Sequence, residues 1–252
     1  MNPLLQLFRI GNAVMGIVGL LMGVLIAAGT GILDHWQPIM FAAVAVFSFI
    51  AGGNSLNDYT DREVDKLAHP ERPLPSGRMR PKQVLFISVA SFAISFISSL
   101  FLNLESIIIV ALAILLMMSY EAKLKKDALT GNLEIALLTG MLFLLGGAVV
   151  GMMDRTYVIA LLAFLAILGR EIVKDIEDME GDFDRLTLPK RIGMRNAGIL
   201  ASLSFLVAVA LSPIPYFDGT FGIWYLAAVA FADAIFIYCS IVHFENPTRG
   251  QK

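Results

Sequence analysis

The sequence predicts an all-α fold: a polytopic bundle of transmembrane helices with a cavity that faces the cytoplasm. Three observations lead to this prediction. Of the 252 residues, 57% are hydrophobic and only 16% are charged, whereas an average soluble domain carries roughly 25% charged residues. The apolar residues gather in eight long segments. Lys and Arg gather in the connections on one side of those segments.

Eight segments are long and apolar enough to cross a bilayer, which takes about 20 residues of helix. The first contains "GNAVMGIVGLLMGVLIAAGTG"; it is too long for a signal peptide and has the small residues of a packed membrane helix. No polar linker divides the chain, so we expect one domain over residues 1–252. The predicted spans are 4–29, 37–57, 83–102, 104–120, 132–152, 156–174, 197–213 and 221–243.

The basic residues predict the orientation of these spans, because Lys and Arg are enriched in cytoplasmic loops. The connections after the second, fourth and sixth spans carry most of them, while the opposite side has only Arg155. Arg9, Arg249 and Lys252 lie near the two ends of the chain. We therefore expect both termini on the cytoplasmic side, together with the long polar connections and the activity.

Two acidic motifs with the same spacing stand at the cytoplasmic ends of the second and sixth spans. Residues 58–65 read "DYTDREVD" and residues 175–182 read "DIEDMEGD", so both follow D-x-x-D-x-x-x-D. Positions 0, 3 and 7 of a helix share one face, so each motif is expected to direct three carboxylates the same way. The acids are Asp58, Asp61 and Asp65 in the first motif, and Asp175, Asp178 and Asp182 in the second.

This set of donors favours a hard cation. Carboxylates placed so closely repel one another, and a divalent ion would compensate them. The sequence supplies oxygen donors without a His or Cys cluster, and Mg²⁺ takes one or two carboxylates together with substrate phosphates. We therefore expect two facing acidic helices to hold Mg²⁺ ions that bridge a diphosphate. The alternative is that the acids pair with nearby Lys and Arg on a solvated loop surface.

Basic residues near the motifs are candidates for binding that diphosphate. Arg72 and Arg78 flank "PLPSG", and Lys123 and Lys125 follow Tyr120 in "YEAKLK". Such cations hold phosphate oxygens and stabilise a leaving diphosphate. Alternatively, these basic residues reflect only the general enrichment of Lys and Arg in cytoplasmic loops.

Polar and ionisable side chains within spans are functional candidates, because they are costly in lipid. Arg9 and Asn12 lie one turn apart in the first span, and Glu171 ends the sixth. These three are expected to line the cytoplasmic cavity. Asp233, inside the last span, is left unassigned, with a structural pairing as the alternative to a functional role.

Three motifs resemble those of the UbiA superfamily of intramembrane prenyltransferases. "NDYTDREVD" resembles its N-D-x-x-D-x-x-x-D motif, "DIEDMEGD" its second aspartate-rich motif, and "YEAKLK" its tyrosine–lysine motif. The likeness covers the chain from Arg9 to about Gly193. "RPLPSG" and "REIVKDIEDMEGD" look most like the archaeal branch that makes digeranylgeranylglyceryl phosphate. The family usually has nine spans, however, and this sequence shows eight before it ends at "HFENPTRGQK".

The resemblance implies a Mg²⁺-dependent transfer of a geranylgeranyl group from geranylgeranyl diphosphate to a lipid-like phosphate acceptor, geranylgeranylglyceryl phosphate. It also implies that the protein contacts membrane lipids, and it implies no nucleic-acid or protein partner. The implied metal ligands are Asn57, Asp61, Asp65, Asp175, Asp178 and Asp182. The implied catalytic residues are Asp61, Asp65, Asp178, Asp182, Tyr120 and Lys123. The implied substrate-binding residues are Arg9, Asn12, Asn54, Asp58, Arg72, Arg78, Lys125, Glu171 and Lys174.

Three other functions remain to be compared with this one. Within the family, the acceptor can instead be an aromatic quinone precursor, since every member binds the same type of diphosphate. A secondary transporter also uses intramembrane carboxylates, but its site generally lies near the bilayer midplane. A CDP-alcohol phosphotransferase would show D-x-x-D-G-x-x-A-R, and here Arg62 follows Asp61 in place of glycine.

Overall fold

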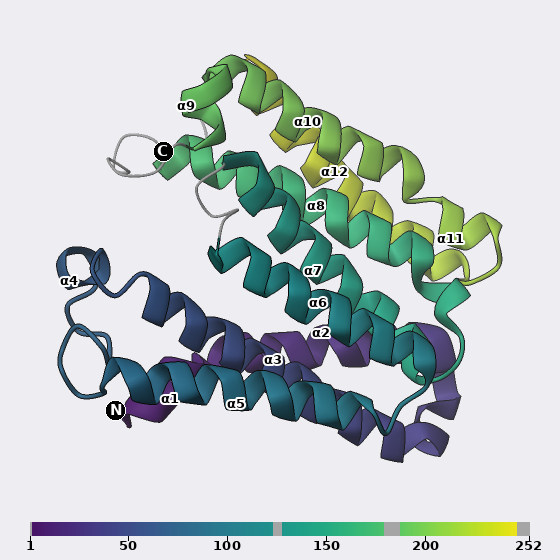
Figure 1. Cartoon of the computed structure of the whole chain (residues 1–252). Coiled ribbons are helices and arrows are strands. Elements are labelled where there is room, and N and C mark those ends of the chain that lie inside the picture. The colour runs from purple at the N-terminus through teal and green to yellow at the C-terminus, as the bar shows by residue number, and fades with distance from the viewer. Residues whose placement is uncertain (1, 123–127, 179–186, 246–252) are drawn as a thin grey trace. The chain divides into compact units, whose positions relative to one another are not determined.

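The computed structural model describes residues 2–122, 128–178 and 187–245, and all regular elements in these ranges are helices (Figure 1). This outcome confirms the predicted all-α class. A helix satisfies its backbone hydrogen bonds within one segment, which is what a chain in lipid requires. The chain divides into two compact units, residues 1–122 with 142–156 and residues 123–141 with 157–252. Each unit is described by itself below.

The first unit begins with a short helix and continues with long apolar ones. Its elements in chain order are α1 (Pro3–Phe8), α2 (Ile10–Ala28), the 3₁₀ helix η1 (Gly29–His35), α3 (Trp36–Thr60), α4 (Asp65–Ala68), α5 (Pro81–Ser99) and α6 (Leu104–Ala122). The last part of α7 (Ala128–Val149) and the 3₁₀ helix η3 (Met153–Thr156) complete it.

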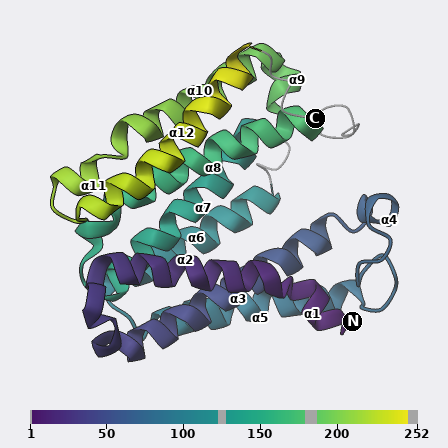
Figure 2. The same ribbon diagram turned by 180° about the vertical axis from the view of Figure 1, so that it is seen from behind.

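Helix α3 is the central element of the first unit, because α1, α2, α5 and α6 all pack against it (Figures 1 and 2). Small residues allow these close contacts: Gly52 of α3 faces the ring of Phe92 on α5, and the Ser88 hydroxyl donates to the Gly52 carbonyl at 2.9 Å. A core of buried aliphatic side chains joins α2, α3, α6 and the end of α7, with Leu20, Val46 and Leu145 among its members.

The second unit is built on α10. Its remaining helices are α8 (Tyr157–Glu177), α9 (Leu188–Ile192), α10 (Met194–Leu211), α11 (Ile214–Phe217) and α12 (Ile223–Glu245), and α10 packs against both α8 and α12. Ser202 of α10 donates to the Ser240 carbonyl of α12 at 3.0 Å. Asp233 accepts a 2.7 Å hydrogen bond from the Ser212 hydroxyl. This contact gives Asp233, which the sequence left unassigned, a partner within the second unit.

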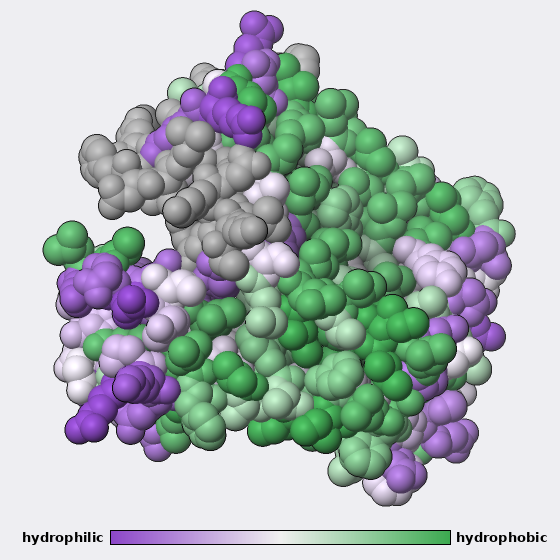
Figure 3. All heavy atoms as spheres, in the orientation of Figure 1, coloured by the Kyte–Doolittle hydropathy of each residue, from purple (hydrophilic) through white to green (hydrophobic). Residues whose placement is uncertain are grey.

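The surface of the helices is apolar, as expected for a protein in lipid. In Figure 3, hydrophobic side chains cover the flanks of the helices and hydrophilic ones gather near the helix ends. Large side chains are widely exposed, for example Phe86 at 73%, Trp224 at 85% and Phe231 at 73%. A soluble protein does not leave so many large apolar groups in water. The chain is therefore an integral membrane protein.

Seven stretches of the described residues are long and apolar enough to cross a membrane. The first, Ile10–Thr60, has 51 residues and holds α2, η1 and α3. Since α2 and α3 pack against each other, the chain turns back at η1 within this stretch. The predicted count of eight spans rests on dividing this stretch in two, and it stays a prediction.

The predicted span 4–29 is wrong in one respect, because it is not a continuous helix. The backbone breaks at Arg9, which has φ 48° and ψ 63° and stands between α1 and α2. This left-handed conformation costs a non-glycine residue roughly 1–2 kcal/mol. A salt bridge to Asp58, described below, compensates this cost and explains why the break falls at an arginine.

We predict that Gly146→Val lowers the melting temperature of the protein in detergent. A Cβ atom at Gly146 would lie 2.6 Å from the Val24 backbone nitrogen and 2.7 Å from Gly23, so α2 and α7 must separate. Overpacking of this kind costs about 1–3 kcal/mol. Tryptophan fluorescence during heating measures the shift, with Gly11→Ala as control because a Cβ there meets nothing within 4 Å. Equal melting temperatures for Gly146→Val and wild type would contradict the close packing.

Candidate active site

A buried charge network lies at the end of α3 where the first acidic motif begins. The Asp58 carboxylate is 2% exposed, and its Oδ1 atom lies 2.6 Å from Arg9 Nη2 and 3.6 Å from Arg72 Nη1. Arg72 Nη1 also donates to Asp65 Oδ2 at 2.6 Å, and Asp65 is itself buried. Two carboxylates are thus compensated by two guanidinium groups. A buried carboxylate needs such partners.

A second network links Asn57 to the neighbouring helix α6. The Asn57 amide nitrogen donates to Glu121 Oε1 at 3.0 Å and to Asp61 Oδ2 at 3.2 Å, and the amide oxygen accepts from Arg9 Nη2 at 3.3 Å. Glu121 Oε2 accepts a 2.5 Å hydrogen bond from the Thr60 hydroxyl. The two networks meet at Arg9, so they form one continuous polar cluster within the first unit.

The prediction that Asp58, Asp61 and Asp65 share the face of one helix is wrong. Helix α3 ends at Thr60, Asp61 is its C-cap residue, and Asp65 is the first residue of α4. Side chains of Thr60 and Asn57 form local hydrogen bonds in the last turn, and such bonds compete with helix continuation. Arg72 nevertheless brings Asp58 and Asp65 together, because its Nη1 atom contacts both.

The remaining predicted residues of the first unit have different surroundings. Asn54 donates to the Phe8 carbonyl at 3.0 Å, which fixes the α1–α2 junction against α3. Asn12 is exposed on α2 and lines an open groove of about 590 Å³ with Arg9 and Gln6. Tyr120 lies half-buried in the last turn of α6, one residue before Glu121.

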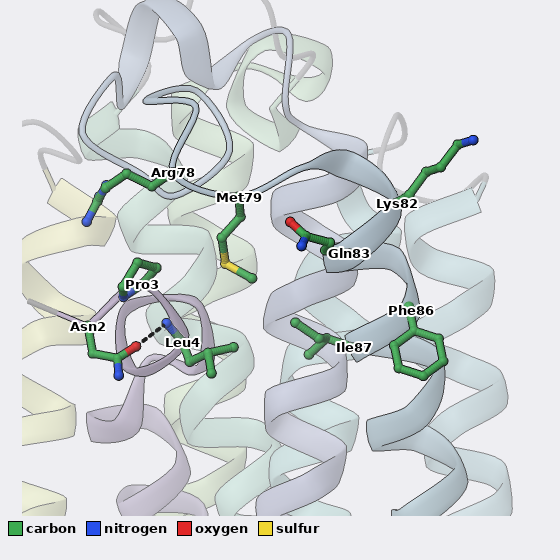
Figure 4. Close-up of a pocket in the computed structure, with 9 residues that line it drawn as sticks. All are labelled: Asn2, Pro3, Leu4, Arg78, Met79, Lys82, Gln83, Phe86 and Ile87. Carbon is green, nitrogen blue, oxygen red and sulfur yellow. Dashed lines mark hydrogen bonds between the residues drawn. The ribbon is translucent and has the colours of Figure 1, made fainter.

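The Arg78 side chain bonds to neutral groups of the first unit. It donates to Gln6 Oε1 at 2.7 Å, to Ser76 Oγ at 2.9 Å and to the Glu71 carbonyl. It also lines an open groove of about 670 Å³ between α1 and the start of α5. Figure 4 shows Arg78 and Lys82 at the rim of this groove, with Phe86 and Ile87 on its wall. Arg78 thus shapes the loop over residues 69–80.

Exposed charges between the end of α3 and α4 form ordinary surface pairs. Lys66 Nζ donates to Glu63 Oε2 at 2.6 Å, and this hydrogen bond and the Lys66 charge hold the pKa of the Glu63 carboxyl below its usual range. Both side chains are exposed, and exposed pairs contribute little to stability. The alternative hypothesis, that the acids pair with Lys and Arg on a solvated loop surface, therefore holds for Glu63. It does not hold for Asp58 or Asp65, which are buried.

The second acidic motif begins in the last turn of α8. Asp175 Oδ2 accepts a 2.8 Å hydrogen bond from Asn132 of α7, and the Leu188 backbone also bonds to this carboxyl. Asp178 follows the end of α8 and is exposed, as is Lys174. Glu171 is buried and accepts from Arg170 Nη1 at 2.6 Å. Asp182, Lys123 and Lys125 lie outside the described residues.

Two residues of these networks were missed by the sequence predictions. Glu121 and Asn132 each bond to a residue of an acidic motif from a neighbouring helix. Their sequence signal is a polar residue near the end of an apolar span, which many helices share. Among the residues that the structure describes, no three His, Cys, Asp or Glu side chains gather closely enough to hold a metal ion.

Comparison with known proteins identifies the family. The model of the UbiA prenyltransferase family matches residues 16–252, which is nearly the whole chain. The chain belongs to the UbiA prenyltransferase family. It is therefore an intramembrane prenyltransferase, in agreement with the resemblance seen in the motifs.

Relatives with known names are similar over almost the full length. The chain is 36% identical to the digeranylgeranylglyceryl phosphate synthase of Methanosphaera stadtmanae, over 99% of this chain and 90% of that protein. It is 38% identical to the synthase of the same name from Methanothermobacter thermautotrophicus, over 99% of this chain and 88% of that protein.

Solved structures share the fold. A structure concerned with digeranylgeranylglyceryl phosphate synthase in membranes matches with a TM-score of 0.88 and 34% identity, covering 99% of this chain and 89% of that one. A UbiA homolog from Archaeoglobus fulgidus, bound to DMAPP and Mg²⁺, matches with a TM-score of 0.80 and 16% identity over 96% of this chain and 86% of that one. The second likeness supports the fold alone.

We predict that Asp58→Ala destabilises the protein by about 1.5–3 kcal/mol, because it removes the buried carboxylate that Arg9 and Arg72 share, while Arg72 keeps its pair with Asp65. Glu63→Ala is the matched control, since it removes an exposed carboxylate whose pair with Lys66 contributes little to stability. Thermal unfolding in detergent compares the two variants. Equal melting temperatures would show that the network around Asp58 does not stabilise this end of the first unit.

Proposed function

We propose that the protein transfers a geranylgeranyl group from geranylgeranyl diphosphate to the free hydroxyl of geranylgeranylglyceryl phosphate. The product is the second ether bond of archaeal membrane lipids. The observation that carries this proposal is the full-length similarity, at 36–38% identity, to two digeranylgeranylglyceryl phosphate synthases. The family and the apolar surface agree with substrates that carry long prenyl chains.

The residues of the acidic motifs fit Mg²⁺. Asn57, Asp61 and Asp65 of the first motif offer oxygen donors, as do Asp175, Asp178 and Asp182 of the second, and oxygen donors suit this ion. The A. fulgidus homolog was solved with Mg²⁺ and DMAPP, which supports the same use here. When bound, Mg²⁺ would neutralise charge on the diphosphate and so favour its departure.

Cations of the chain itself are suited to hold the leaving group. Arg72 is 21% exposed and Arg9 is 31% exposed, so each guanidinium keeps an accessible part while Asp58 fixes it. Guanidinium groups bind phosphate oxygens with two parallel hydrogen bonds. We assign to Arg72 and Arg9 the role of stabilising the diphosphate as negative charge develops on it. Tyr120 and Lys123 remain proposed catalytic residues by their resemblance to the family motif.

The transfer exchanges one C–O bond for another. The allylic C–O bond of the donor breaks, and its electron pair leaves with the diphosphate. The glycerol oxygen then forms a new bond to the allylic carbon and releases its proton. Apolar walls exclude water, which would otherwise trap the electron-poor carbon. We assign Arg9 to the donor side, because its bond to Asp58 places it beside the first acidic motif.

The proposal includes the placement of the protein in the membrane. We propose that residues 1–252 act as one domain, since the family match extends across both compact units. We also propose that the acidic motifs and both termini face the cytoplasm, because the basic connections are expected on that side.

We predict that purified protein in detergent forms the lipid ether from geranylgeranyl diphosphate and geranylgeranylglyceryl phosphate only when Mg²⁺ is present. Asp61→Ala and Asp178→Ala should each lower the rate by about 10²-fold or more, because each removes a proposed ligand of the Mg²⁺ that would stabilise the departing diphosphate. Diphosphate release and prenylated product are measured together, with and without EDTA. Asp154→Ala, an exposed acid in η3, is the control and should leave the rate unchanged.

A parallel reaction with 4-hydroxybenzoate tests the acceptor. If only the aromatic acceptor forms product, the protein is a prenyltransferase, but the proposed lipid acceptor is wrong. If neither acceptor reacts under any metal condition, the proposed transfer is wrong as a whole.

We predict that a membrane-impermeant maleimide distinguishes the two sides of the protein in intact cells. The single native cysteine is first removed by Cys239→Ser. In that background Asp154→Cys should be labelled from outside, while Ala68→Cys in α4 should be labelled only after permeabilisation. Both positions are exposed, so access to the reagent decides the result. The reverse pattern would show that the acidic motifs face outward.

A further inference from the structure

The Asn57 amide can adopt only one orientation in its surroundings. Its nitrogen lies between two carboxylates, with Glu121 Oε1 at 3.0 Å and Asp61 Oδ2 at 3.2 Å, and its oxygen faces Arg9 Nη2 at 3.3 Å. Turning the amide over would place its oxygen against the two carboxylates and its NH₂ group against the guanidinium. Both contacts would be repulsive, since an amide NH₂ only donates and a carboxylate only accepts.

This orientation matters for metal binding because only one atom of an asparagine side chain is a ligand for a hard ion. Mg²⁺ binds oxygen, so the amide oxygen must be presented and the nitrogen must be held elsewhere. Residues that fix a ligand in this way do so through their own hydrogen bonds. In this structure the shorter contact of the amide nitrogen is to Glu121, on a different helix.

Glu121 is itself fixed on both of its oxygens. Glu121 is only 9% exposed. Its Oε1 atom accepts from Asn57, and its Oε2 atom accepts from the Thr60 hydroxyl at 2.5 Å. The Thr60 hydroxyl has a single proton and a second acceptor, the Asn57 carbonyl at 3.0 Å; the shorter, charge-assisted bond to Glu121 is the stronger one. A carboxylate held in this way has little freedom to rotate and so holds the amide in place.

We propose that Glu121 is a positioning residue, which orients the Asn57 amide so that its oxygen is available as a ligand for the metal–diphosphate complex. Glu121 acts through Asn57 and does not itself bind the ion. This inference rests on the proposed Mg²⁺-dependent function and adds to it a residue that lies outside both aspartate motifs. It also gives a reason for a buried acid at the end of an apolar helix, where an ionisable side chain is costly.

Three variants separate this role from a merely structural tie between α3 and α6. Glu121→Ala removes the nearer of the two acceptors of the Asn57 amide and leaves Asp61. Glu121→Gln keeps an oxygen that can accept from Asn57 and places an NH₂ group toward Thr60, whose hydroxyl can accept. Thr60→Val removes the second bond to Glu121 and leaves the Asn57 contact intact. A structural role predicts similar effects for Glu121→Ala and Thr60→Val, whereas positioning predicts a clearly larger effect for Glu121→Ala.

Binding of Mn²⁺, a paramagnetic substitute for Mg²⁺, gives a readout that does not depend on turnover. The free-ion electron paramagnetic resonance signal is titrated with protein, alone and with geranylgeranyl diphosphate in the absence of acceptor. Glu121→Ala should weaken Mn²⁺ binding about 10–100-fold, as loss of a group that orients a metal ligand typically does. Glu121→Gln and Thr60→Val should stay within about tenfold of wild type on the same scale. The Mg²⁺ concentration for half-maximal transfer should follow the same order.

A double variant completes the test. If Glu121 acts only through Asn57, Glu121→Ala should weaken Mn²⁺ binding no further once Asn57→Ala is present. The inference is overturned if folded Glu121→Ala binds Mn²⁺ as wild type does, or if Thr60→Val weakens binding equally. Absence of metal dependence in the wild-type protein is a different result, because it removes the proposed function together with this inference.

Discussion

The first unit depends on one buried carboxylate, Asp58, which holds two guanidinium groups from distant parts of the sequence. Arg9 comes from the junction of α1 and α2, and Arg72 comes from the loop after α4. Their shared contact with Asp58 fixes the strained backbone at Arg9 and the path of the loop around α3. Removing Asp58 would take a carboxylate partner from both guanidinium groups, and only Arg72 has a second one, Asp65, in the cluster described above. The positions of Asp65 and of the Asn57 amide follow from this arrangement.

The long helices could be predicted from the sequence, because apolar length is the constraint that lipid imposes. Predicted 37–57 corresponds to Trp36–Thr60, and predicted 104–120 corresponds to Leu104–Ala122. The breaks could not be predicted in the same way. Arg9 interrupts an otherwise continuous apolar segment because of its partner on α3, and the helix ends at Thr60 because polar side chains there bond locally. Both causes depend on contacts that spacing does not reveal.

The sequence predicted the acidic residues of the candidate site but not the residues that bond to them. The D-x-x-D-x-x-x-D motifs stand out because three acids recur at fixed spacing, whereas Glu121 and Asn132 are single polar residues on other helices. Which side chain of α6 or α7 meets an acidic motif depends on the rotation of that helix about its axis. Both residues lie near the end of an apolar span with other polar residues beside them, so periodicity does not fix this rotation. Hydrogen bonds at 3.0 and 2.8 Å show the pairing directly.

The two motifs share their spacing but differ in how their first acid is compensated. Asp58 is buried between two guanidinium groups, while Asp175 accepts from the neutral amide of Asn132 and from the Leu188 backbone. A carboxylate held by cations contributes little net negative charge to its surroundings, whereas one held by an amide keeps its charge. Equal spacing therefore does not make the two motifs equivalent. The first motif supplies fixed cations beside its acids, and the second retains a carboxylate whose charge a divalent ion can still compensate.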